Sequence, residues 1–319
     1  SRRQRQMCIR DRNYNEFYEK RHFVSGLDTP CDTVTLCGQE VPFGNMLFCA
    51  DNGVVAEGVT QCGQEVTATV AENMGHGEST VCLMAKHLGM DVFPVDIGVA
   101  RPIKNEKVLQ FAVRRGTANF AHEPAMTRKE AIEAVEIGIK MAEMCAEKGY
   151  SLLIGGEMGI GNTTTSSAVL AVLLGADVEA VTGRGGGITE ESFRKKKAVI
   201  RTAIEVNRPD RDDVVGVLSK VGGFDLAAMC GAFLGAAAAR RPAVIDGLIS
   251  AAAALCAVRL SPNVHGYLVP SHASFEIGYR LAMEAMDLRP LFDLGMRLGE
   301  GSGCPLAFQV LKAACAVMN

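Results

Sequence analysis

Several features that mark common protein classes are absent or scarce in this sequence. Tryptophan is absent and aromatic residues make up 6% of the 319 residues, so aromatic platforms that stack nucleic-acid bases are not expected. The 33 basic and 36 acidic residues give a net charge of −3, without the basic excess of proteins that bind nucleic acids or anionic membranes. The longest apolar stretch, 226–239, is too short to span a bilayer. We therefore expect neither a nucleic acid nor a membrane as a partner.

The cysteines and histidines do not form a recognisable metal or disulfide pattern. The 11 cysteines are odd in number, no two are spaced C-x-x-C, and most lie inside apolar runs. The six histidines are scattered and form no H-E-x-x-H motif. The sequence therefore predicts buried thiols in a reducing compartment, and no structural metal.

From about residue 46 the chain alternates short apolar segments with longer helical patterns. The capping-box sequence at 127–130 marks one helix start. Such alternation predicts an α/β fold with a mostly parallel sheet wound with helices, and a ligand site at the carboxyl ends of the strands. The predicted strands are 46–50, 91–97, 151–154 and 243–247, and the predicted helices are 65–74, 79–88, 127–148, 163–174, 248–258 and 305–317.

The first 45 residues differ in character from the rest of the chain. Residues 1–12 are basic and lack both helical periodicity and the apolar stretch of a signal peptide. We interpret residues 1–45 as an atypical segment that is either of artefactual origin or, with part of the C-terminal helices, a small helical lobe. Residues 46–319 are predicted to form the main domain.

Two glycine-rich segments indicate a phosphate-containing ligand. Glu157 lies between pairs of glycines after an apolar strand, and the following helix is predicted to present free N–H groups to an anion. A second loop, 182–189, is followed by the basic cluster 194–197, from which one lysine could reach a phosphate. The alternatives are an ordinary glycine-rich turn and a solvated helix face. Neither loop has the Walker A or the G-x-G-x-x-G pattern.

A second carboxylate, Glu300, also lies among glycines, at 299–303. In an apolar pocket such a group acquires a raised pKa and serves as a general base near neutral pH. The alternative is a charge that is favoured at a helix N-terminus. The absence of a G-x-S-x-G motif disfavours serine hydrolysis. We expect Glu157 and Glu300 to meet in one crevice.

Five motifs in the same order resemble the nicotinate-nucleotide–dimethylbenzimidazole phosphoribosyltransferase family, and the resemblance covers residue 46 to the C-terminus. They lie at 49–59, 64–67, 156–164, 183–185 and 295–303. The resemblance implies a homodimeric, cytoplasmic pentosyltransferase of cobalamin biosynthesis, with a Rossmann-like core and no cofactor. Its substrates are nicotinate mononucleotide and 5,6-dimethylbenzimidazole or a related base, and its products are α-ribazole 5′-phosphate and nicotinate.

The resemblance also implies roles for individual residues. The catalytic base falls on Glu300 and the second active-site glutamate on Glu157, while Gln64 and Met158 match positions of the base pocket. The positions around the ribose phosphate are Gly159, Gly161, Asn162, Thr163, Gly185, Gly186, Lys196 and Ser274. One carboxylate would take the proton of the attacking benzimidazole, and the other would stabilise positive charge on the ribose.

The sequence departs from the family pattern at two places. The usual Asp-His-Gly is Asp51-Asn52-Gly53 here, which we interpret as subfamily variation bearing on the base pocket, and the N-terminal Pro-Pro-Gly-Ser-Leu-Gly is missing. Two other functions stay open at this stage. A non-catalytic binder of aromatic bases or nucleotides would bind without turnover, and an oxidoreductase would bind a nicotinamide dinucleotide.

Overall fold

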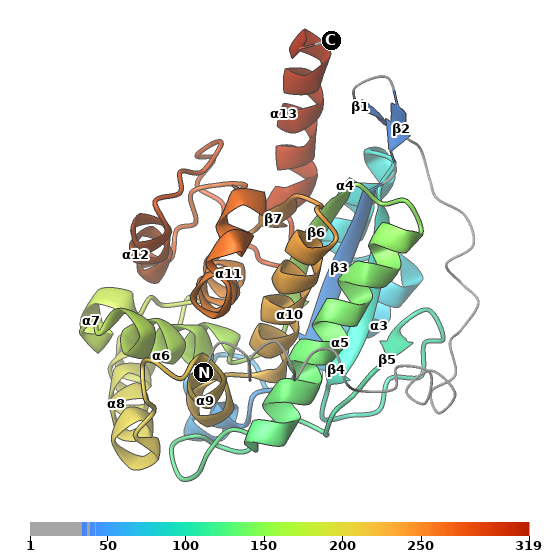
Figure 1. The fold of residues 1–319 in the computed structure, drawn as a ribbon. Helices are drawn as coiled ribbons and strands as arrows, with labels where there is room; N and C mark the ends of the chain where they lie inside the picture. The colour runs from blue at the N-terminus through green and yellow to red at the C-terminus, as the bar shows by residue number, and fades with distance from the viewer. Residues whose placement is uncertain (1–33, 37–38, 42, 319) are drawn as a thin grey trace.

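The computed structural model describes residues 34–36, 39–41 and 43–318 (Figure 1). The strands are β1 Val34–Leu36, β2 Gln39–Val41, β3 Phe43–Ala50, β4 Asp91–Gly98, β5 Leu109–Gln110, β6 Leu152–Met158, β7 Ala243–Ile245 and β8 Leu268–Pro270. The α-helices are α3 Glu65–His76, α4 Thr80–His87, α5 Arg128–Glu147, α6 Asn162–Leu174, α7 Val178–Val181, α8 Glu190–Asn207, α9 Val214–Val221, α10 Phe224–Ala238, α11 Leu248–Leu260, α12 Ile277–Met286 and α13 Gly303–Met318. Two 3₁₀ helices are η1 Gly53–Glu57 and η2 Pro262–Tyr267.

Six strands form one sheet in the order β5-β4-β3-β6-β7-β8, and every neighbouring pair is parallel. From β3 the chain first winds outward through β4 to β5, and then returns to the other side of β3 to continue through β6, β7 and β8. This is the Rossmann order, and its switch point lies between β3 and β6. The predicted parallel α/β fold is therefore confirmed.

Helices cover both faces of the sheet because side chains of a strand alternate between its faces. Met46 and Phe48 of β3 belong to the larger core cluster, whereas Leu47 and Cys49 belong to a cluster on the other side. Figure 1 shows α5 and α10 on one face and α3 and α4 on the other. The two helices α5 and α10 approach closely at Gly138, where an added Cβ would overlap a backbone carbonyl of α10.

Helix boundaries follow the sequence signals closely. Thr127 caps α5, and the side chain of Glu130 completes the capping box by accepting from the Thr127 backbone N–H at 2.7 Å. The helix ends at Glu147, and Gly149, two residues later, has a φ of 92°. The C-terminal helix predicted at 305–317 spans Gly303–Met318.

The strand that carries Glu157 is longer than predicted. The expected strand ended at residue 154 and left Glu157 in a loop, but β6 continues to Met158. The extension forms because β3 supplies a parallel partner along the whole length, from Phe43 opposite Leu152 to Cys49 opposite Met158. Glu157 is therefore held by a central strand rather than by a turn.

Most of the expected small lobe falls on residues 1–33, which lie outside the described residues. Within the described part of 1–45 there is an antiparallel pair, β1 and β2, and then the start of β3 at Phe43, three residues before the expected boundary. Figure 1 shows α13 projecting from the body of the protein near this strand pair. No helix in the described part of the chain has the length and hydropathy needed to cross a membrane.

Candidate functional site

A cleft of about 320 Å³ lies at the carboxyl ends of β6 and β7, beside the switch point of the sheet. Its walls come from the β6–α6 turn, the glycine loop between α7 and α8, the β7–α11 turn, the β8–α12 loop and the segment before α13. These segments are far apart in sequence but converge because parallel strands all end at the same edge of the sheet. The predicted site residues that line the cleft are Glu157, Met158, Gly159, Gly161, Asn162, Thr163, Gly185, Gly186, Ser274 and Glu300.

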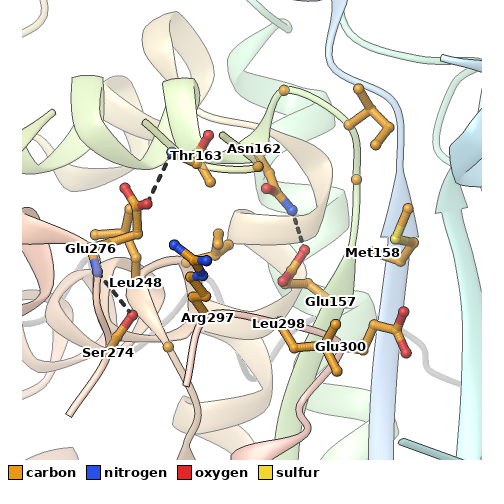
Figure 2. Close-up of a pocket in the computed structure, with 18 of the residues that line it drawn as sticks. Glu157, Met158, Asn162, Thr163, Leu248, Ser274, Glu276, Arg297, Leu298 and Glu300 are labelled. Atoms are coloured by element: carbon orange, nitrogen blue, oxygen red, sulfur yellow. Dashed lines mark hydrogen bonds between the residues drawn. The ribbon is translucent and has the colours of Figure 1, made fainter. Parts of the chain in front are cut away.

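Glu157 projects from the end of β6 into the cleft, and only 8% of its surface is exposed. Its side chain is buried, and the Asn162 amide at the start of α6 donates a hydrogen bond to Oε2 (Figure 2). Burial is the main cause that raises the pKa of Glu157 to about 8, and the nearby carboxylates Asp225 and Asp246 add to it. Without a ligand, Glu157 is therefore mostly protonated at neutral pH.

Glu300 reaches the same cleft from the turn before α13. This turn packs directly on β6, since Gly301 lies against Gly156 and a Cβ added to Gly299 would lie 3.2 Å from Glu157 Oε1. Burial raises the pKa of the Glu300 carboxyl, while the backbone N–H of Val81 at the start of α4 opposes the shift. The expectation that Glu157 and Glu300 meet in one crevice is confirmed.

The glycine loop between α7 and α8 closes the opposite end of the cleft. Lys196 is buried behind it, where its ammonium group donates to Thr163 Oγ1 at 2.9 Å and to Gly183 O at 3.0 Å. Burial lowers the pKa of Lys196 to about 8, and the charge of Glu276 opposes the shift. Lys196 does not line the cleft, so its charge reaches a ligand through the Thr163 hydroxyl.

The prediction that α6 presents free N–H groups is correct only in part, since most of the amides at its start are already bonded. The N–H of Asn162 donates to Gly159 O, and those of Thr164 and Thr165 donate to Gly161 O. Gly161, with a φ of 94°, is the N-cap of α6, and its carbonyl accepts the first hydrogen bonds of the helix. The positive end of the α6 dipole still faces the cleft.

Of the two residues expected in the base pocket, Met158 lines the cleft and Gln64 does not. The Gln64 amide donates to Asn52 O at 3.1 Å and does not line the cleft, whereas the preceding residues Gln61 and Cys62 do. Asn52, at the position where the family pattern has histidine, is fully buried beneath the β6–α6 turn and donates to Ile160 O. It supports this turn rather than the wall of the cleft.

Several further side chains of the cleft were not assigned a role from the sequence. Asp246 follows β7 as Asp51 follows β3, so an acid directly after an apolar strand was an available signal. Burial raises the pKa of Asp246 to about 7. His272 and Glu276 have no local signal in the sequence, whereas Arg297 lies within the motif 295–303 but was given no role there. Figure 2 shows the Arg297 side chain between Glu276 and Glu157, where it adds positive charge.

Comparisons with known proteins agree with one another. A family model described as phosphoribosyltransferase matches residues 42–319. A nicotinate-nucleotide–dimethylbenzimidazole phosphoribosyltransferase of Clostridium tetani is 46% identical over 86% of this chain and 76% of its own length. The enzyme of the same name from Acetivibrio thermocellus is 49% identical over 85% of this chain and 78% of its own. The crystal structure of CobT from Thermus thermophilus has a TM-score of 0.82 at 39% identity, covering 86% of this chain and 82% of that one.

Proposed function

The chain belongs to the nicotinate-nucleotide–dimethylbenzimidazole phosphoribosyltransferase family, and from this we propose that it moves phosphoribose from nicotinate mononucleotide to 5,6-dimethylbenzimidazole or a related base. The products are α-ribazole 5′-phosphate and nicotinate, in a reaction of cobalamin biosynthesis. The observation that carries the proposal is the convergence of Glu157 and Glu300 in one cleft beside the switch point of the sheet. The reaction needs two carboxyl groups there, for two different tasks.

We assign the first task, removal of a proton from the attacking base, to Glu300. One benzimidazole nitrogen attacks C1′ of the ribose, and the other nitrogen loses its proton. Glu300 Oε2 has no hydrogen-bond partner within the described residues, so this oxygen keeps its capacity to accept that proton. Burial raises the pKa of Glu300 toward neutral pH, and a general base is most effective when its pKa lies near the pH at which it works.

We assign the second task, stabilisation of positive charge, to Glu157. Nicotinate departs from a cationic pyridinium, so its departure needs no general acid, but positive charge develops on the ribose. Glu157 is mostly protonated in the free protein, and a bound cation favours its ionised form. The positively charged pyridinium ring of bound nicotinate mononucleotide would favour the ionised form of Glu157, which is the form that the transition state requires.

We place the ribose phosphate at the end of the cleft formed by Gly185, Gly186 and Ser274. Arg297 and, through Thr163, Lys196 bring positive charge to this end, beside the Glu276 carboxylate, which accepts from Gly185 N at 2.9 Å. Gly159, Gly161 and Asn162 line the ribose between this end and Glu157, and Met158 contacts the base. We propose no role in substrate contact for Gln64, because its amide holds Asn52 instead.

The proposed reaction is tested by the release of nicotinate from nicotinate mononucleotide when 5,6-dimethylbenzimidazole is added. We expect release by the wild type and a loss of about 100-fold or more in kcat for Glu300→Ala, because general-base groups contribute about 10²–10⁴. The control is Glu205→Gln, which changes an exposed carboxylate on α8 and leaves the rate unchanged. Calorimetric binding of both substrates without turnover would instead support the non-catalytic binder.

We also propose that the protein is a cytoplasmic homodimer. The projecting helix α13 supports the dimer, since Val310 and Val317 are 43% and 86% exposed on a largely apolar helix. Among the described residues eight cysteines are free and six of these are buried, which supports a reducing compartment. Light scattering should give twice the 33.9 kDa chain mass for the wild type and a monomer for the double variant Val310→Asp/Val317→Asp. A monomeric wild type would refute the dimer.

A further inference from the structure

The turn that presents Glu300 adopts an unusual backbone conformation. Three consecutive residues, Gly299, Glu300 and Gly301, have φ values of 85°, 60° and 74°. The left-handed region is disfavoured for Glu300, which carries a Cβ. Such a conformation persists only where surrounding contacts hold it in place.

One buried carboxylate supplies these contacts. Asp246 lies directly after β7, is 3% exposed, and accepts a hydrogen bond from Gly303 N to Oδ1 at 2.8 Å. The backbone N–H groups of Gly301 and Gly247 also donate to this carboxylate. Asp246 thus binds the turn on the C-terminal side of Glu300, and ties it to a strand of the central sheet.

The contact between Gly303 and Asp246 is tightly packed. A Cβ added at Gly303 would lie 2.8 Å from Asp246 Oδ1 and would overlap the ring of His272. His272 is itself buried, and its Nδ1 lies 3.0 Å from Ser271 Oγ. Asp246 and His272, which both lie against Gly303, therefore restrict the position of the turn.

We propose that Asp246 is a positioning residue for Glu300, in that its hydrogen bonds to the amides of the turn fix the direction in which the Glu300 carboxylate enters the cleft. The inference rests on the proposed function. Electrostatics argues against a merely stabilising role, because Asp246 adds a buried carboxyl to a cleft that already holds Glu157 and Glu300. The backbone amides around Asp246 oppose the rise in its pKa only in part, since burial is the largest cause of the shift.

The inference predicts a change in kcat rather than in substrate binding. Asp246→Asn keeps the shape of the side chain but replaces one acceptor oxygen by an NH₂ group, which faces backbone N–H donors. We expect the turn to shift and kcat to fall about 100-fold, which is the loss expected when a catalytic group is misplaced by about 1 Å. The KM for nicotinate mononucleotide should change by less than about threefold, since the phosphate end is untouched. Asp293→Asn is the matched control, because Asp293 also accepts from a glycine amide, Gly295 N at 3.1 Å, but is exposed.

A double-mutant cycle separates positioning from a direct catalytic role. If Asp246 acts only through Glu300, adding Asp246→Asn to Glu300→Ala lowers kcat by less than about threefold further. A full multiplicative loss would overturn the proposal, because Asp246 would then act on the substrate or on the fold by itself. Gly303→Ala breaks the same contact without changing a charge, and should reproduce the loss and its dependence on Glu300.

Hydrogen exchange tests the inference without reference to activity. In Asp246→Asn the amides of Gly301 and Gly303 should exchange at least about tenfold faster, and in Asp293→Asn they should be unchanged. Unaltered exchange in Asp246→Asn would refute the proposed contact. If the wild type releases no nicotinate, the proposed function fails while the exchange result still decides the role of Asp246. Gly303→Ala supplies the same exchange measurement should Asp246→Asn fail to fold.

Discussion

Replacing Glu157 by glutamine should change the way in which stability depends on pH. In the folded protein, burial raises the pKa of Glu157 to about 8, against 4.5 for an unperturbed glutamate. Between these two values the folded state holds a proton that the unfolded state has lost. The stability that this proton provides is complete below pH 4.5, and is lost as the pH rises through 8.

The size of the effect follows from the same two values. The interval between 4.5 and about 8, at about 1.4 kcal/mol per pH unit, corresponds to roughly 5 kcal/mol. Burial also raises the pKa values of Asp225 and Asp246, to about 6 and about 7, so these groups too lower the free energy of unfolding as the pH rises. Their contributions are present in both proteins, so the difference between wild type and Glu157→Gln isolates most of the Glu157 contribution.

The measurement is urea unfolding of the two proteins at several pH values from 5 to 9. The free energy of unfolding of the wild type, relative to that of Glu157→Gln, should fall by most of the roughly 5 kcal/mol over this range. Glu205→Gln, with its exposed carboxylate, should follow the wild type. Parallel curves for wild type and Glu157→Gln would show that Glu157 is ionised in the folded protein, and the reasoning would be refuted.

Three other predictions follow from the cleft. Binding of nicotinate mononucleotide at pH 7 should release up to about one proton, measured by calorimetry in buffers of different ionisation enthalpy, and Glu157→Gln should release almost none. Gly156→Ala should lower the free energy of unfolding by about 1–3 kcal/mol in urea titrations, because the added methyl would overlap Leu47; an unchanged midpoint would contradict this. Lys196→Met should raise the KM for nicotinate mononucleotide about tenfold or more, because Thr163 loses a charged partner. An unchanged KM would remove Lys196 from the phosphate site.

Much of the site could be read from local patterns in the sequence. The two glutamates stand out because glycines surround them, and the parallel α/β arrangement places the ends of its strands at one edge. The resemblance to a family then linked Glu157 and Glu300 to one reaction. What local patterns could not supply was the distinction between Gln64, which holds Asn52, and its neighbours Gln61 and Cys62, which line the cleft.

For the helices that it predicted, the sequence by itself determined the ends to within a few residues, because caps and periodicity act over a few residues. Thr127 and Glu130 form the expected capping box for that reason. Only the tertiary structure decided the length of β6, because β3 pairs with it along its whole length. It also decided the raised pKa of Glu157 and the binding of the Glu300 turn by Asp246. Both depend on exclusion of water and on contacts between segments that the chain brings together only when the whole sheet has formed.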